Sequence, residues 1–241
     1  MALDALFIGA HPDDVELTSG GLAALLAAHG HAVGIVDLTR GESASRGSVE
    51  ERAGEAQAAA RALGVASREN LGLPDLGLDR SETAQLEAVV ACLRRHRPAL
   101  VVSHDAHDSH PDHVEASRLV ARACYLAGLA RFPAAGERHR PGRLLFALYR
   151  APIAAHLVVD VTPVWERRME AVRAHRSQLD SGVGPETYLT GPGFLEELEA
   201  RARSWGAAIG ARYGEGYRLR GPVGIVDARV LLEDARRSVH P

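Results

Sequence analysis

Short apolar runs alternate with amphipathic segments along most of the chain. Residues 5–10 are apolar and lie beside glycine and proline, a pattern typical of a buried parallel strand. Similar runs predict strands at 32–38, around 70–71, and at 100–103, 144–149 and 156–161. Apolar residues at helical spacing predict helices at 19–29, 49–63, 83–97, 111–128, 162–177 and 194–210.

Helix boundaries carry recognisable local signals. Ser48 and Glu51 have the spacing of a capping box at the start of one helix, and Gly64 suits its end. Pro111 suits the first position of another helix, where a missing N–H costs nothing. These signals agree with the apolar periodicity, so both point to the same elements.

The alternation of strands and helices predicts an α/β fold. We expect a single doubly wound, mostly parallel sheet of the Rossmann-like kind, with the less regular final third as a C-terminal elaboration. A chain of 241 residues can bury one substantial core, and it contains no internal repeat or low-complexity linker. We therefore expect one domain over residues 1–241.

Composition and charge narrow the function classes. Apolar content of 46% and charged content of 24% are ordinary for a water-exposed globular protein. A net charge of -3 gives no electrostatic reason to expect a nucleic-acid or membrane partner. No apolar run is long enough for a membrane span and the N-terminus lacks a basic region, so we expect a cytoplasmic protein.

The lysine and cysteine content excludes several kinds of catalytic and structural site. All 28 basic residues are arginine, which rules out a lysine Schiff base, a phosphate-loop lysine and a Ser–Lys dyad. Cys92 and Cys124 are isolated in helical segments, so neither a disulfide framework nor a cysteine-rich zinc site is indicated.

Two polar clusters follow predicted strands. His11-Pro12-Asp13-Asp14 comes after the first strand, and His110-Pro111-Asp112-His113 comes after the strand at 100–103. Carboxyl ends of parallel strands form the usual ligand crevice of such sheets. We expect the clusters to meet in one metal site. The alternative is two unrelated polar loops.

The residue types suit a catalytic zinc. Such a site takes three histidine or carboxylate ligands, and His11, Asp14 and His113 satisfy that count. Hydrolysis also needs a base and an oxyanion donor, roles open to Asp13 and His110. Asp112 orients a ring or only favours the helix dipole.

The same residues resemble the signature motifs of the LmbE/PIG-L family of zinc-dependent N-deacetylases. Residues 10–16 and 110–113 carry the two motifs, and 37–42, 73–75 and 176–178 are also similar. Together they resemble the bacillithiol-pathway branch, whose members remove acetate from N-acetylglucosaminyl malate. The likeness runs from Leu3 to about Tyr217.

The resemblance implies a role for each site residue. The implied metal ligands are His11, Asp14 and His113, and the implied general base is Asp13. His110 would stabilise the oxyanion and protonate the leaving amine, with Asp112 as its partner. The implied metal is zinc or ferrous iron, the substrate a small amino sugar, and the assembly a homo-oligomer such as a hexamer.

Arg52 is the candidate for substrate binding. It falls in the first turn after the capping box, where a cation opposes the helix dipole unless an anion compensates it. The family has a substrate-binding arginine at the matching position. The alternative is an exposed arginine without a partner, and Arg40 and Arg46 lie nearby in sequence.

Phe194 differs from the family pattern, and two histidines have no counterpart in it. Phe194 stands where close relatives often carry a tyrosine, so a hydroxyl near the site is absent there. His104 and His107 are additional imidazoles in the site loop, which we expect to be exposed. The alternative is that they contact the substrate or a second metal.

Other classes fit the sequence less well. An oxidoreductase of this fold would carry G-x-G-x-x-G after the first strand, and a serine hydrolase would carry G-x-S-x-G; neither motif is present. A non-catalytic zinc-binding module does not explain the additional Asp13 and His110. Within the enzyme class, the alternatives are deacetylation of another N-acetylglucosaminide and amidase action on a thiol conjugate.

Overall fold

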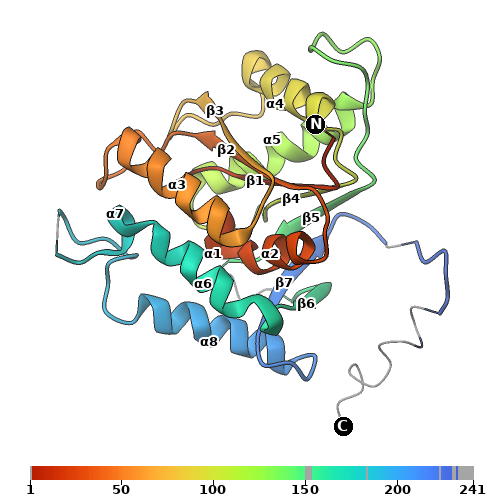
Figure 1. Cartoon of the computed structure of the whole chain (residues 1–241). Coiled ribbons are helices and arrows are strands. Elements are labelled where there is room, and N and C mark those ends of the chain that lie inside the picture. The colour runs from red at the N-terminus through yellow and green to blue at the C-terminus, as the bar shows by residue number, and fades with distance from the viewer. Residues whose placement is uncertain (1, 150–153, 183, 223, 230–231, 233–241) are drawn as a thin grey trace.

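The strands of the chain form one mixed sheet. They are β1 (Ala5–Gly9), β2 (Val33–Thr39), β3 (Ser67–Leu73), β4 (Leu100–His104), β5 (Arg143–Ala147), β6 (Leu157–Asp160) and β7 (Gly214–Leu219). The computed structural model describes residues 2–149, 154–182, 184–222, 224–229 and 232, and orders them β3-β2-β1-β4-β5-β7-β6 (Figure 1). Neighbours from β3 to β5 are parallel, and β7 is antiparallel to β5 and β6. The predicted α/β sheet is confirmed.

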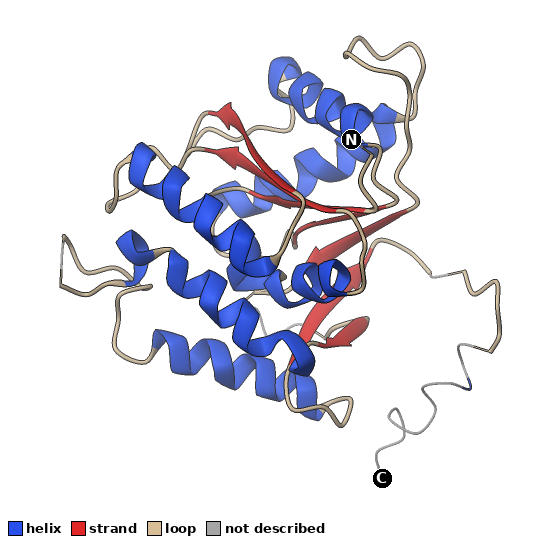
Figure 2. Cartoon of the chain, viewed as in Figure 1, coloured by secondary structure: helices blue, strands red, loops and turns tan. Residues whose placement is uncertain are grey.

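Helices cover both faces of the sheet, as Figure 2 shows. They are α1 (Asp14–Thr18), α2 (Gly20–Ala28), α3 (Val49–Leu63), α4 (Thr83–His96), α5 (Pro111–Ala127), the 3₁₀ turn η1 (Thr162–Val164), α6 (Trp165–Ala174), α7 (Arg176–Leu179) and α8 (Phe194–Ala207). One face carries α4 and α5, and the other carries α1, α2, α3 and α6. Leu6 and Ile8 of β1 pack in the first of these apolar layers and Phe7 in the second, as alternation along a buried strand requires.

Most element boundaries agree with the sequence patterns to within a few residues. The capping box at α3 is present, with the Glu51 amide donating to Ser48 Oγ over 3.1 Å and the Ser48 amide donating to Glu51 over 2.8 Å. Gly64 ends this helix in the left-handed conformation at φ 77°. Local chemistry alone therefore decides where α3 begins and ends.

Three details differ from the expectations. The five-residue α1 precedes the helix expected from residue 19, and it is too short to show a helical period. The helix expected at 162–177 is interrupted at His175, whose Nε2 lies 3.5 Å from the buried Glu16. The strand β7 was not predicted, because its glycines and Glu215 disfavour a strand unless neighbours on both sides pair with it.

Glu215 of β7 ties the C-terminal elaboration to the helices beside the first strand. Its carboxylate accepts hydrogen bonds from the amides of Gly21 and Leu22, at 2.7 and 2.8 Å, in the first turn of α2. Arg168 of α6 lies 3.2 Å from the same carboxylate and donates to the carbonyl of Leu17 in α1 over 2.8 Å. The buried ion pair of Glu215 and Arg168 therefore fixes the positions of α1 and α2.

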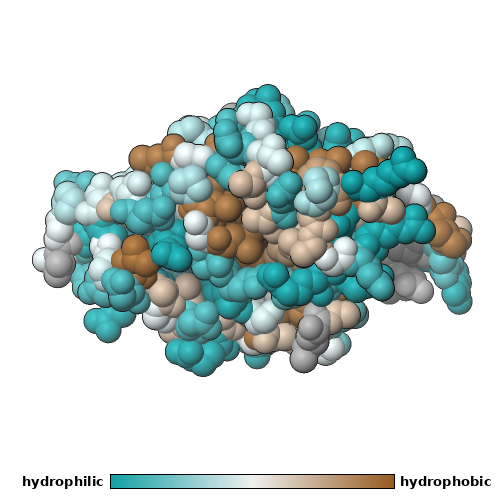
Figure 3. All heavy atoms as spheres, turned by 90° about the horizontal axis from the view of Figure 1, so that it is seen from above, coloured by the Kyte–Doolittle hydropathy of each residue, from teal (hydrophilic) through white to brown (hydrophobic). Residues whose placement is uncertain are grey.

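The outer surface agrees with the composition. Hydrophilic side chains cover most of the face drawn in Figure 3, around hydrophobic ones that gather toward its middle. Among the residues described, no helix combines the length and the apolar character that crossing a bilayer demands.

Replacing Glu215 tests the link between β7 and the N-terminal helices. Glu215→Ala removes the acceptor of two helix amides and leaves Arg168 buried without its carboxylate, so the free energy of unfolding should fall by about 3–5 kcal/mol. Urea unfolding measures it. The control is Glu115→Ala, which breaks surface pairs with Arg80 and Arg118 and should cost at most about 1 kcal/mol. Equal losses in the two variants would contradict the role given to Glu215.

Candidate functional site

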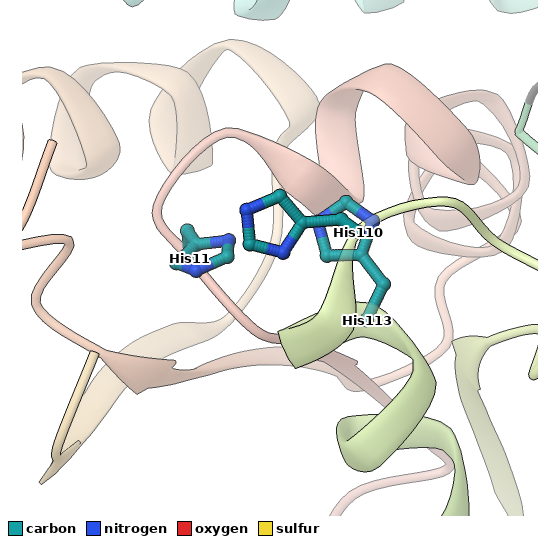
Figure 4. A group of neighbouring side chains, drawn as sticks. All are labelled: His11, His110 and His113. Carbon is teal, nitrogen blue, oxygen red and sulfur yellow. The ribbon is translucent and has the colours of Figure 1, made fainter. Parts of the chain in front are cut away.

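The topology places both polar clusters at one edge of the sheet. The chain leaves β1 in one direction for β2 and β3, and later returns on the other side of β1 with β4 and β5. Such a reversal of strand order opens a crevice beyond the carboxyl ends of the strands. His11 follows β1 and His110 caps the start of α5 after β4, and their ring centroids are 4.9 Å apart (Figure 4). The structure thus brings the two clusters together.

The carboxylate of Asp14 is the centre of this group. Its Oδ1 lies 3.1 Å from Nε2 of His113, and its Oδ2 lies 3.3 Å from Nδ1 of His11. The backbone amide of His11 also donates to Oδ2 over 2.7 Å. A third imidazole, His104, has Nε2 3.2 Å from Oδ2. One carboxylate therefore draws together side chains from two strand ends and the start of α5.

In His11 and His113, the ring nitrogen that points away from Asp14 lies close to another carboxylate. Nε2 of His11 lies 3.1 Å from Asp75 and 3.3 Å from Asp112, and Nδ1 of His113 lies 3.1 Å from Asp108. Metal-binding histidines in proteins have this arrangement, because an outer acceptor fixes the ring and makes the inner nitrogen a better ligand. Asp108 was not recognised in the sequence, since nothing in its spacing marks it as a partner of His113.

The electrostatics of the group favour a bound cation. Burial by itself would lower the pKa of His11, but Asp14, Asp112 and Asp75 raise it to about 12. Burial likewise opposes protonation of His113, whose pKa Asp14 and Asp108 raise to about 9. The carboxylates therefore favour positive charge between them, and a divalent ion can supply it.

The donor set also suits a transition metal. Ring nitrogens of His11, His110 and His113 lie within 4.8 Å of one another (Figure 4), and so do ligand atoms of Asp14, His104 and His113. Imidazole nitrogen with carboxylate oxygen is the donor chemistry of catalytic zinc and of non-haem ferrous sites. The residues present therefore fit the metal that the sequence motifs imply.

Asp13 lies beside Asp14 in a strained conformation. Its φ of 121° is in the region that only glycine adopts freely, and such a conformation costs about 1–3 kcal/mol. Burial raises the pKa of its carboxyl to about 6, although the guanidinium of Arg52 acts in the opposite direction. A carboxylate with a pKa near 6 is ionised at neutral pH and is a stronger base than an exposed aspartate.

Arg52 is buried against the first cluster. Its Nη2 lies 3.6 Å from Asp13 Oδ2 and donates to the carbonyl of Pro12 over 2.8 Å, while Nη1 donates to the carbonyl of Gly41 over 3.1 Å. The anion that the sequence required beside this cation is thus present within the chain. Arg52 also lines the cavity above the cluster.

His110 and Asp112 are connected through the backbone. Nδ1 of His110 accepts a hydrogen bond from the Asp112 amide over 3.2 Å, which caps α5 and leaves the proton of the neutral ring on Nε2. The carboxylate of Asp112 faces His11 and accepts from the Leu76 amide over 2.7 Å. Asp112 was expected to partner the His110 ring; in the structure its carboxylate contacts the His11 ring.

The additional histidines divide into one buried and one exposed residue. The expectation for His104 was wrong: β4 extends through it, only 2% of it is exposed, and Nε2 accepts from the Ala10 amide over 3.0 Å. A histidine at the last position of a buried strand points into the protein, which a loop assignment does not foresee. His107 is exposed, as expected, and contacts Asp105 over 2.7 Å.

A cavity of about 480 Å³ opens over the cluster. Its size lies within the range of small-molecule sites. The lining residues are His11, Asp13, Asp14, Leu17, Ser43, Ala44, Ser45, Arg52, Asp75, Leu76, Asp108, Ser109, His110, Pro111, His113, Tyr149, Gln178, Tyr188 and Leu189. Phe194 is buried against Tyr188, with ring centroids 5.3 Å apart. The later segments that supply Tyr149 and Gln178 were not recognised as part of the site.

Comparisons with known proteins agree with this geometry. The PIG-L family model, described as GlcNAc-PI de-N-acetylase, matches residues 6–124, which include both clusters. A solved structure of a conserved protein from Thermus thermophilus superposes with a TM-score of 0.85 at 40% identity, over 93% of this chain and 97% of the other.

Two curated relatives have names that state a reaction. The 1D-myo-inositol 2-acetamido-2-deoxy-alpha-D-glucopyranoside deacetylase of Nocardiopsis dassonvillei is 34% identical, over 81% of this chain and 90% of its own length. The diacetylchitobiose deacetylase of Thermococcus kodakarensis is 30% identical, over 89% of this chain and 82% of its own length. Both names describe a deacetylase that acts on an acetylated amino sugar.

The strain at Asp13 predicts an unusual order of stabilities. Asp13→Gly and Asp13→Ala remove the same carboxylate, but only glycine adopts φ 121° freely. The free energy of unfolding of the glycine variant should therefore exceed that of the alanine variant by about 1–2 kcal/mol. Urea denaturation of both proteins measures the difference. At Glu50, in the first turn of α3, the same two substitutions should give the opposite order. Greater stability of the alanine variant at position 13 would show that the backbone there is unstrained.

Proposed function

This chain belongs to the PIG-L family of N-acetylglucosamine deacetylases, and we propose that it hydrolyses the N-acetyl group of an N-acetylglucosaminide with a zinc ion bound at the cluster. The observation that carries the proposal is the shared carboxylate of Asp14 between His11 and His113, with Asp13 and His110 beside it. Ferrous iron is the alternative metal, because its donor preferences overlap those of zinc here.

His11, Asp14 and His113 would hold the metal. When bound, zinc supplies a Lewis acid that polarises an amide carbonyl and makes water more acidic. The outer carboxylates of Asp75 and Asp108 keep the two rings oriented toward Asp14.

Asp13 is the proposed general base. It accepts a proton from the attacking water as the new C–O bond forms, and returns that proton to the amine nitrogen as the C–N bond breaks. The resemblance gives this second transfer to His110, but a neutral His110 ring is too weak an acid to make it. Its pKa of about 6 leaves it ionised at neutral pH, and Arg52 lies 3.6 Å from it. The rate should therefore fall as the pH decreases through about 6, because the protonated carboxyl no longer accepts a proton.

His110 is the proposed donor to the substrate oxygen. Burial and the neighbouring His113 and His11 lower its pKa, so the ring is neutral at pH 7. Because Nδ1 is occupied by the Asp112 amide, Nε2 carries the proton and donates it in a hydrogen bond to the oxyanion.

The aglycone is the finer part of the proposal. We favour N-acetylglucosaminyl malate, the bacillithiol precursor, because Arg52 lines the cavity and a guanidinium can pair with a carboxylate of the malate. The named relatives favour the second candidate class, an inositol or sugar aglycone.

Two variants separate metal binding from proton transfer. His113→Ala should lose most of the bound zinc, measured by elemental analysis, with the sheet intact by circular dichroism. Asp13→Asn should retain the metal and yet lose about 10²–10⁴ in rate, the usual contribution of a positioned base. Zinc retained by His113→Ala would contradict the role of His113 as a ligand. Zinc lost from Asp13→Asn would show that Asp13 is itself a ligand.

Kinetics on four substrates test the function and the aglycone together. The panel is N-acetylglucosaminyl malate, the inositol N-acetylglucosaminide, diacetylchitobiose and free N-acetylglucosamine, with acetate release as the readout. Arg52→Ala should lower kcat/KM about ten- to a hundred-fold on the malate glycoside and much less on the free sugar. An equal loss on both would assign Arg52 to holding Asp13, and no turnover of any member by the wild type would reject the deacetylase proposal.

A further inference from the structure

Tyr149 lines the cavity and has a hydroxyl group that no other described residue uses. Its chain position lies two residues beyond the end of β5, and its side chain lines the same cavity as Asp13, Asp14 and His110. The hydroxyl is buried and has no hydrogen-bond partner among the residues that the structure describes. A buried, unpaired polar atom in a native protein requires an explanation, because leaving it unpaired costs about 1–3 kcal/mol.

The ring of Tyr149 is held firmly in place. The guanidinium of Arg201 on α8 packs over its face, 4.5 Å from the ring centroid, and donates a hydrogen bond to the Tyr149 carbonyl. The stacking and the hydrogen bond anchor the residue at both its side chain and its backbone. The position of the hydroxyl is therefore set before a ligand arrives, which is what an efficient donor needs.

The surroundings keep the hydroxyl protonated. Burial raises the pKa of Tyr149, and the charges of Asp13 and Asp14 raise it further, against the opposing effect of Arg201. Tyr149 lines the same cavity as these two carboxylates.

The carboxylates of Asp13 and Asp14 do not accept a hydrogen bond from the Tyr149 hydroxyl. Asp14 is engaged by imidazoles and by the His11 amide, and Asp13 is paired with Arg52. The second tyrosine of the cavity differs, because the hydroxyl of Tyr188 already donates to Glu197 over 2.5 Å. The Tyr149 hydroxyl is therefore available to an atom of a bound ligand.

We propose that Tyr149 donates a hydrogen bond to the acyl oxygen of the bound N-acetyl group, as a second donor beside His110. The inference rests on the proposed deacetylase function and adds a catalytic residue to it. As water attacks the acyl carbon, the carbonyl electron pair moves onto this oxygen, and a donor aimed at it stabilises the transition state more than the substrate. No proton leaves Tyr149 in this step.

The test is Tyr149→Phe, with Tyr213→Phe as the matched control. The hydroxyl of Tyr213 donates to Glu199 over 2.8 Å, and Tyr213 is not among the residues that line the cavity. Tyr149→Phe should lower kcat about 100-fold with KM nearly unchanged, and should leave Tm the same or higher because no hydrogen bond is lost. Tyr213→Phe should give the reverse pattern, a lower Tm with an unchanged kcat.

Each other outcome has a definite meaning. An unchanged kcat in Tyr149→Phe, while the wild type releases acetate from the substrate panel, overturns the inference and leaves the proposed function standing. A raised KM at constant kcat also overturns it, because the hydroxyl would then contact the sugar or the aglycone. A wild type that releases no acetate from any substrate rejects the proposed function itself, and the inference with it.

Discussion

The arrangement of the site depends on how one buried carboxylate is shared. Asp14 receives His11 from its own loop and His113 from α5, together with the amide of His11. A carboxylate has enough lone pairs for these three partners only if each approaches from a different direction. The parallel neighbours β1 and β4 provide those directions, because their ends open at the same edge of the sheet.

Charge balance extends from this carboxylate outward. Asp75 and Asp112 face His11, and Asp108 faces His113, so negative charge surrounds the imidazoles on the sides away from Asp14. Such an assembly is stable only with compensating positive charge, from protons or from a metal ion. The same property that favours a metal also explains why so many ionisable groups can lie within a buried region.

The C-terminal part of the chain completes what the N-terminal part begins. The family model ends at residue 124, yet Arg168 and Glu215 hold α1 and α2 from behind the first cluster. Tyr149 and Gln178 form cavity walls that the N-terminal motifs do not contain. Members that share the motifs can therefore differ in substrate, because the walls come from segments outside them.

The sequence by itself determined the fold class, most element boundaries and the location of both histidine clusters, because these depend on local periodicity, caps and strand ends. Tertiary structure alone decided the rest. His104 is buried, since strand pairing, rather than its neighbours in sequence, sets the direction of its side chain. Arg52 found its anion in Asp13, and His113 its outer carboxylate in Asp108, through contacts that no spacing rule encodes. The strand β7 forms only because β5 and β6 flank it, so its hydrogen bonds are supplied by the sheet and not by its own residues.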